Sequence, residues 1–110
     1  MGATTHTVLY QFKSYLPAAE VEDACARFLR LKETCVSHNG GNYIRSMRGG
    51  RDNSPEGLQH GMTHGFVAEF ASVEDRNYYV TTDPAHRAFV KSIEDLVEKS
   101  IVVSFRSGDY

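Results

Sequence analysis

Three features are missing from the 110-residue sequence, and each absence removes a class of protein. Lysine and arginine form no cluster and the formal net charge is −2, which argues against a nucleic-acid-binding surface. No apolar run approaches the roughly 18 residues of a membrane-spanning helix. The N-terminus has no charged segment followed by an apolar block, so no secretory signal is expected. The sequence therefore predicts a cytoplasmic protein without nucleic-acid or membrane partners.

Cysteine is scarce as well. Cys25 and Cys35 are the only two, and both fall within one predicted helix. Ten residues of helix would separate them by about 15 Å, which is too far for a disulfide. Neither has a histidine nearby in sequence and both lie on an apolar helix stripe, so a cysteine nucleophile is not expected.

Metal and phosphate sites lack the spacing that they need. His60 and His64 are about 13 Å apart on an extended chain, so no metal site is predicted. Residues 49–61 are rich in glycine, but no Gly-Lys-Ser or Gly-Lys-Thr follows, which argues against a P-loop. We interpret this segment as a long loop of the kind that forms lids or partner contacts. No cofactor is predicted.

A single α+β domain over residues 1–110 is indicated by the pattern of strands and helices. Strands are predicted at 4–13, 42–48, 62–71 and 101–105. Helices are predicted at 16–36, from Ser72, and from Asp83 to near Lys99, the last two being one helix broken at Pro84. The order β-α-β-β-α-β is typical of the ferredoxin-like split βαβ fold, in which helices cover one face of a four-stranded antiparallel sheet.

Alternation along the strands predicts an inner face and an outer face for the sheet. The inner side chains are His6, Val8, Tyr10 and Phe12, followed by His64, Phe66, Ala68 and Phe70. In 42–48, a shared face is predicted for Tyr43, Arg45 and Met47. The outer face would carry Leu9, Val67 and Val102 and would need a cover. A second copy packed sheet on sheet is the simplest cover, so a homodimer of the dimeric α/β-barrel type is predicted.

The most informative stretch is Asp83-Pro84-Ala85-His86. Asp83 is suited to the N-cap of a helix and Pro84 to its first position. His86 would then lie in the first turn, where the positive end of the helix dipole favours a neutral imidazole, the form that accepts a proton. Two interpretations stay open: His86 is the working group of a site, or it is a surface residue near the cap.

Two further histidines, His6 and His64, fall on the inner face, where polar side chains need partners or a wet cavity. They are either core histidines bonded to backbone carbonyls or, together with His86, the lining of a pocket between sheet and helices. Tyr78 and Tyr79 precede His86, and only one of them can face inward. An inward tyrosine is either part of the core or a donor to a carbonyl or enolate oxygen.

Three segments, taken together, resemble the stress-response A/B barrel family. They are HTVLYQF at 6–12, GMTHG at 61–65 with Phe70, and DPAH at 83–86 with Phe89. The likeness covers nearly the whole chain. It implies a ferredoxin-like subunit, a homodimer joined through its sheets, and no cofactor.

The family includes a plant polyketide cyclase, olivetolic acid cyclase, which closes a ring by aldol condensation. The resemblance implies that His86 is the general base or acid and that Tyr79 is its catalytic partner. The spacing between these two residues is one residue longer here than in that enzyme. The residues implied in substrate binding are His6, His64, Phe66 and Phe89. Asp83 replaces a histidine of that enzyme, and Gly65 and Phe66 alter the pocket wall.

Three functions are left open. The first is a cofactor-free cyclase or lyase acting on a polyketide-like or other small carbonyl substrate. In it, His86 would take a proton while Tyr79, His6 or His64 holds the oxyanion. The second is a non-catalytic stress-response or small-molecule-binding protein. The third is a monooxygenase of the dimeric α+β barrel type, either cofactor-free or haem-handling.

Overall fold

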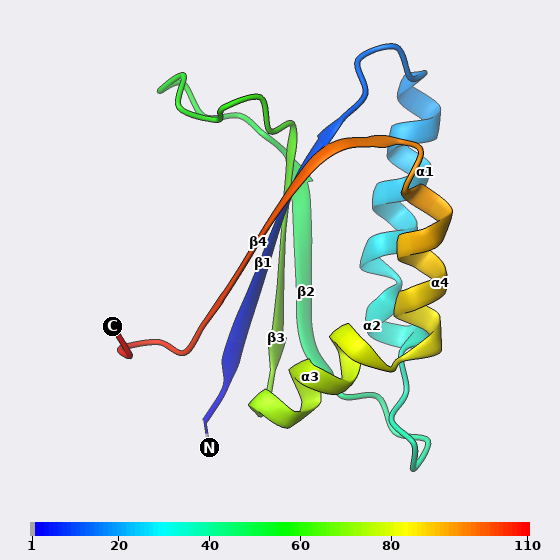
Figure 1. Cartoon of the computed structure of the whole chain (residues 1–110), viewed down its shortest axis with the longest axis vertical. Coiled ribbons are helices and arrows are strands. Elements are labelled where there is room, and N and C mark those ends of the chain that lie inside the picture. The colour runs from blue at the N-terminus through cyan, green and yellow to red at the C-terminus, as the bar shows by residue number, and fades with distance from the viewer. Residues whose placement is uncertain (1) are drawn as a thin grey trace.

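The computed structural model describes residues 2–110 and shows one antiparallel sheet with helices on one of its faces (Figure 1). In chain order the elements are β1 (Thr4–Phe12), α1 (Ala18–Leu29), α2 (Leu31–Thr34), β2 (Ile44–Arg51), β3 (His64–Phe70), α3 (Val73–Thr81), α4 (Pro84–Ile93) and β4 (Val97–Phe105). The strand order is β2-β3-β1-β4, and every neighbouring pair is antiparallel. The predicted ferredoxin-like α+β fold is therefore confirmed.

β1 and β3 form the centre of the sheet, and both alternate between buried and half-exposed side chains. The buried residues of β1 are Thr4, His6, Val8, Tyr10 and Phe12, and those of β3 are Phe66, Ala68 and Phe70. His64, the first residue of β3, lies on the same face and is half-buried. The inner face predicted for these two strands is thus confirmed, because the period of two follows directly from strand geometry.

The core lies between this inner face and the helices. Phe28 of α1 stacks on Phe66 of β3 with ring centroids 4.3 Å apart, and it meets Phe89 of α4 at 5.0 Å. Phe66 and Phe89 are only 1% and 5% exposed, so the structure places both of these candidate ligand-binding residues in the packed core. Within residues 2–110, none of the helices has the length and apolar character needed to cross a membrane.

The helical segments end earlier than the sequence predicts. The helix expected over 16–36 is divided at Arg30 into α1 and α2, and Cys35 after it is extended. The helix expected to reach Lys99 ends at Ile93, and Val97 already pairs with Phe12 in β4. An acidic pair at 94–95 opposes helix continuation because the C-terminal end of a helix disfavours negative charge. Pairing with β1 then satisfies the backbone of this segment.

The face predicted for β2 is wrong, and the cause is a change in strand register. Pairing with β3 shifts by one residue between Ile44 and Ser46. Ile44 therefore occupies the core position, while Tyr43 is half-buried and Arg45 is exposed. Met47 returns to the inner face, where it packs against the core. A bulge of this kind changes the side-chain alternation that a regular strand would have.

The outer face of the sheet is covered by no described helix (Figure 1). Leu9 and Val67 lie on it, as predicted, but Val102 does not, because it pairs with Val8 on the inner face. The outer-face residues of β4 are Ile101, Val103 and Phe105, which are 39%, 56% and 48% exposed. An apolar row on an edge strand normally needs a partner surface.

Two adjacent glycines of β2 differ sharply in the space around them, which gives a test of the packing. A Cβ atom at Gly49 would lie 2.2 Å from Cδ2 of Phe66, whereas one at Gly50 would meet nothing within 4 Å. We expect Gly49→Ala to lower the free energy of unfolding by about 1–3 kcal/mol, because the Phe66 ring must move. Gly50→Ala, the matched control, should change it by about 0.5 kcal/mol or less. Urea denaturation measures both, and equal effects would contradict this packing.

Candidate functional site

The N-terminus of α4 is built as the sequence predicts, and it sets the position of His86. Asp83 is the N-cap, and its Oδ1 accepts hydrogen bonds from the backbone N–H groups of Ala85 (2.9 Å) and His86 (3.4 Å). Pro84 occupies the first turn, where its missing N–H costs no hydrogen bond. The cap therefore holds the backbone from which the His86 side chain projects.

The imidazole of His86 has one nitrogen engaged by the protein. Nδ1 lies 2.9 Å from the backbone oxygen of Tyr79. Because a carbonyl oxygen only accepts, Nδ1 carries the proton, and Nε2 of the neutral ring keeps its lone pair. Burial lowers the pKa of His86, opposed by the Tyr79 carbonyl and by the charge of Asp83. At neutral pH the ring is thus a neutral proton acceptor.

Tyr79 is the inward-facing member of the tyrosine pair. It is 1% exposed, and its ring stacks on that of His86 with centroids 3.8 Å apart and planes inclined by 26°. Burial, above all, raises the pKa of the Tyr79 phenol, which therefore stays protonated. Tyr78 lies nearer the surface, where its hydroxyl donates to the backbone oxygen of Val36 at 3.4 Å. Tyr79 is therefore the tyrosine that packs against the His86 ring.

His6 joins these two residues from the sheet. It is 7% exposed, its Nδ1 lies 2.6 Å from Oγ of Ser104 in β4, and its ring meets that of Tyr79 edge-on at 6.0 Å. Burial lowers the pKa of His6 to about 4, and the positive charges of Arg76 and His86 act in the same direction. We refer to His6, Tyr79 and His86 as the histidine–tyrosine cluster.

His64, in contrast, lies apart from this cluster. β1 and β3 are antiparallel, so His64 pairs with Tyr10, four residues along β1 from His6 and about 13 Å away. The His64 ring meets that of Phe12 edge-on at 5.0 Å, and burial and the charge of Arg51 lower its pKa. The hypothesis that His6, His64 and His86 line one pocket, one of the two alternatives left open by the sequence, is therefore wrong for His64.

A groove beside His86 offers room for a ligand. Its volume is about 570 Å³, and it is lined by Val80, His86, Arg87, Ala88, Val90, Lys91 and Glu94. A second hollow of about 270 Å³ shares Val90 and Glu94 with this groove and is also lined by Tyr10 of β1 and Ser100 of β4. Val80 and Val90, 43% and 42% exposed, supply apolar surface. The histidine–tyrosine cluster thus borders an open, partly apolar groove.

Several residues of this region were missed by the sequence reasoning. The groove residues Val90 and Glu94 follow His86 at intervals of four. This spacing places side chains on one face of a helix, so the sequence could have predicted that these residues lie beside His86. The hydrogen bond that holds the side chain of the cap residue Asp83 could not have been predicted from a local pattern. Oδ2 of the buried Asp83 accepts a hydrogen bond of 2.5 Å from the hydroxyl of Tyr43, a contact over 40 positions.

A metal centre is not supported by the described part of the chain. Within residues 2–110, no group of three or more histidine, cysteine or acidic side chains is placed to hold an ion. Cys35 is fully buried, and burial together with the charge of Asp83 raises the pKa of its thiol to about 12.

Burial of His6 predicts a loss of stability in acid. Its pKa of about 4 in the folded protein lies below the value of about 6.5 in an unfolded chain, so the unfolded state binds the proton first. The contribution of neutral His6 to the free energy of unfolding is fully present above pH 6.5. It falls by about 3 kcal/mol as the pH decreases toward 4. Urea denaturation between pH 7 and 4 measures this slope.

The His6→Gln variant should lose most of that pH dependence, whatever its stability at pH 7. His38→Gln removes an exposed histidine and should keep the wild-type slope. An identical slope in all three proteins would show that His6 does not titrate in this way.

Solved structures of the same fold provide a comparison. The Arabidopsis thaliana protein At3g17210 matches with a TM-score of 0.84 and 23% identity over 97% of each chain. A hydroxynitrile lyase from Passiflora edulis matches with a TM-score of 0.84 and 22% identity, over 99% of this chain and 96% of that one. A dimeric ferredoxin-like protein from Bacteroides fragilis matches with a TM-score of 0.71 and 21% identity, over 96% of this chain and 97% of that one.

At these identities the solved structures establish the fold. No curated protein sequence matches the chain. The family model described as "Stress responsive A/B Barrel Domain" matches residues 4–107, which is nearly the whole chain and agrees with the resemblance seen in its motifs. The chain therefore belongs to the stress-responsive A/B barrel domain family.

Proposed function

We propose that the chain is a cofactor-independent enzyme in which His86 takes a proton from a small, largely apolar carbonyl compound or hydroxynitrile. One observation carries the proposal. The hydrogen bond from Nδ1 of His86 to the Tyr79 carbonyl leaves Nε2 as the acceptor of a neutral imidazole that lines a groove. A general base needs this combination of free lone pair, neutral ring and access.

The proposed reaction begins with transfer of a proton from the carbon next to a carbonyl to Nε2 of His86. The C–H electron pair moves into an enolate, whose oxygen becomes negative. Arg87 and Lys91 line the same groove and supply positive charge for that oxygen, a role for which the sequence suggested Tyr79, His6 or His64. The enolate then adds to a second carbonyl carbon, and the imidazolium returns the proton to the new alkoxide.

Tyr79 has a positioning role in this proposal. Its backbone oxygen sets the tautomer of His86 and its ring packs flat against the imidazole, while its side chain is almost fully buried. His6 packs behind Tyr79 and is itself held by Ser104. The cluster thus orients the base, which is a recognised way for a protein to favour one reactive geometry.

The substrate class follows from the groove and from one relative. A volume of about 570 Å³ with valines in the wall suits a compact apolar molecule. The Passiflora edulis relative is a hydroxynitrile lyase, and a hydroxynitrile carries an O–H proton that a neutral base can take. A binding protein without turnover would use the same groove, and the monooxygenase hypothesis stays a prediction.

Proton exchange tests the base without knowledge of the natural substrate. The protein is incubated with phenylacetone in D₂O at pD 7.4, and deuterium uptake next to the carbonyl is followed by NMR. We expect uptake above the buffer rate, and His86→Gln should reduce the protein-dependent rate about 100-fold or more. Cleavage of mandelonitrile to benzaldehyde, followed by absorbance, is the parallel assay.

The matched control is His64→Gln, which alters a histidine outside the cluster and should keep the wild-type rate. Equal rates in wild type and His86→Gln would remove His86 as the base. Absence of turnover of both probes, together with a raised melting temperature in their presence, would instead support the binding-protein hypothesis.

We also infer that two chains associate through the outer face of the sheet. The outer-face apolar row of β4, with Leu9 and Val67 beside it, has no cover within residues 2–110. The Bacteroides fragilis relative is described as a dimer of the same fold. Sheet-on-sheet packing would remove this row from water in both copies at once.

Introducing a charge into the row tests the dimer face. Val103→Asp should convert a dimer into a monomer, because the carboxylate would be desolvated in the contact. Sedimentation velocity at about 10 μM protein reads the mass directly. Tyr15→Asp, at a 75% exposed position outside the strands, should remain dimeric. A Val103→Asp protein that is still a dimer would place the contact elsewhere.

A further inference from the structure

The phenol hydroxyl of Tyr10 is a buried polar group that the chain leaves unpaired. Tyr10 is only 8% exposed and lies on the inner face of β1. Its backbone oxygen accepts hydrogen bonds from the N–H of Thr63 at 2.8 Å and from the hydroxyl of Thr63 at 3.2 Å. Its side-chain hydroxyl, in contrast, has no partner within residues 2–110. Buried hydroxyls are normally hydrogen-bonded, so this one calls for an explanation.

The hydroxyl borders a hollow, and the rings around it fix its position. The Tyr10 ring lies among those of Phe12, Phe28 and Phe66, with centroids 5.7, 5.8 and 5.8 Å away. Every fully enclosed side-chain nitrogen and oxygen of residues 2–110 has a hydrogen-bond partner, so an unpaired hydroxyl must touch open space. Tyr10 lines the hollow of about 270 Å³. Its hydroxyl therefore reaches into that hollow.

This hollow continues the groove beside His86. The two spaces share Val90 and Glu94. Val90 follows His86 by four residues of α4, and Ile93, which also lines the hollow, follows it by seven. At 1.5 Å per residue, the hollow lies about 6–10 Å from His86 along the helix axis. A molecule whose carbonyl group lies beside His86 therefore has room to extend into the hollow.

The lining of the hollow favours an uncharged hydrogen-bond acceptor. Burial raises the pKa of Tyr10 to about 12, so at neutral pH the hydroxyl keeps its proton and is available as a donor. Ser100, which pairs with Tyr10 across the two strands, adds a second hydroxyl to the lining. The charged lining residues are Glu94, Glu98 and Lys99, two negative and one positive, so an anion is disfavoured.

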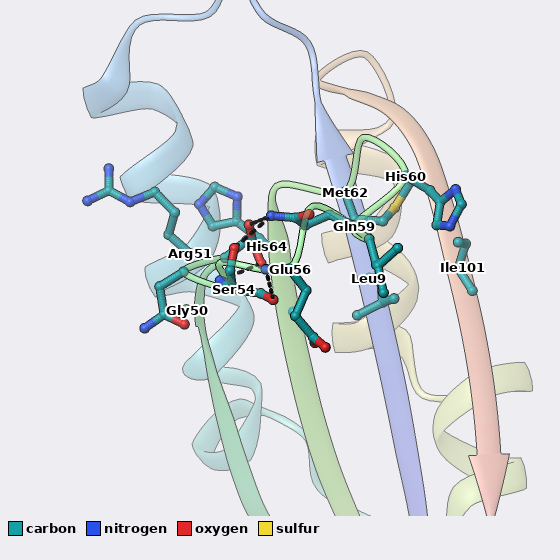
Figure 2. Close-up of a pocket in the computed structure, with 14 residues that line it drawn as sticks. Leu9, Gly50, Arg51, Ser54, Glu56, Gln59, His60, Met62, His64 and Ile101 are labelled. Carbon is teal, nitrogen blue, oxygen red and sulfur yellow. Dashed lines mark hydrogen bonds between the residues drawn. The ribbon is translucent and has the colours of Figure 1, made fainter.

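A different hollow, of about 510 Å³, lies on the outer face of the sheet over Gly50, Gly65, Leu9 and Ile101 (Figure 2). Leu9 and Ile101 belong to the face that we expect a second copy to cover, so the partner would occupy this space. The hollow at Tyr10 shares no lining residue with it and none with the outer-face apolar row. It therefore stays open in the proposed dimer.

We propose that Tyr10 determines which substrates the groove accepts, by donating a hydrogen bond to a second, uncharged oxygen of the substrate while the carbonyl lies beside His86. The proposal rests on the groove of the proposed function and adds the substrate class, a compact dicarbonyl or keto ether with its two oxygens about 6–10 Å apart. A substrate without the second oxygen leaves the hydroxyl unpaired, and sites built around a hydrogen bond discriminate strongly against such analogues.

Two ketones of nearly equal shape test this role by binding alone. 1,4-Diacetylbenzene carries a second carbonyl across its ring, and 4′-isopropylacetophenone has a CH–CH₃ group in place of that C=O. Each is titrated into the ¹⁵N-labelled full-length protein, and dissociation constants are obtained from backbone amide shifts. Tyr10→Phe should weaken the binding of 1,4-diacetylbenzene about fivefold. It should change that of the isopropyl compound by less than about twofold, because this compound offers no second acceptor.

The matched control is Tyr15→Phe, which removes a hydroxyl at a 75% exposed position outside both hollows and should leave both dissociation constants unchanged. Tyr10→Phe keeps the ring among its aromatic neighbours and breaks no hydrogen bond of the side chain. Its melting temperature without ligand should therefore not fall below that of the wild type. A fall of several degrees would show that the hydroxyl is bonded within the chain and would overturn the proposal.

Unchanged binding of both ketones in Tyr10→Phe would also overturn the proposal, and so would a wild-type protein that binds neither. Deuterium uptake into the acetyl groups of 1,4-diacetylbenzene in D₂O reports on His86 separately. Uptake that His86→Gln abolishes, with binding that Tyr10→Phe leaves unchanged, would keep His86 as the base and remove the role of Tyr10. Binding that depends on Tyr10, without any uptake, would keep the role of Tyr10 and remove the base.

Discussion

The pairing of β1 on both of its edges is the constraint on which the rest of this structure depends. β1 bonds β3 on one side and β4 on the other, both antiparallel. This register places Ser104 beside His6 on the inner face and aligns Leu9 with the two glycines on the outer face. A slip of one residue would exchange the two faces, because strand side chains alternate. The contacts of His6 with Ser104 and Tyr79 would then be lost.

The chemistry of the candidate site comes from burying neutral imidazoles. His6 and His86 lie where burial disfavours the charged form, and in each ring Nδ1 has a hydrogen-bond partner. The same burial that prepares His86 to accept a proton weakens the fold in acid through His6. The proposed role of His86 and the predicted acid sensitivity therefore have one physical origin, the cost of charging a group away from water.

The two faces of the sheet are put to different uses because helices cover only one of them (Figure 1). The inner face is packed with aromatic rings, and a Cβ atom at Gly49 would overlap the Phe66 ring. The outer face carries an apolar row and a hollow above Gly50, the next residue along the strand. Glycine is required at the first position by close packing, whereas at the second it leaves room.

The amino-acid sequence alone determined the order of elements, the inner faces of β1 and β3, the Asp83 cap and the family resemblance. These features depend on alternation, capping and motifs, which neighbouring residues encode locally. Tertiary structure alone decided that His6 joins His86 while His64 lies at the far end of the pair, that Val102 faces inward, and that Tyr43 reaches Asp83. Strand register and the contacts that follow from it join residues far apart in the chain, and no local pattern specifies which ends meet.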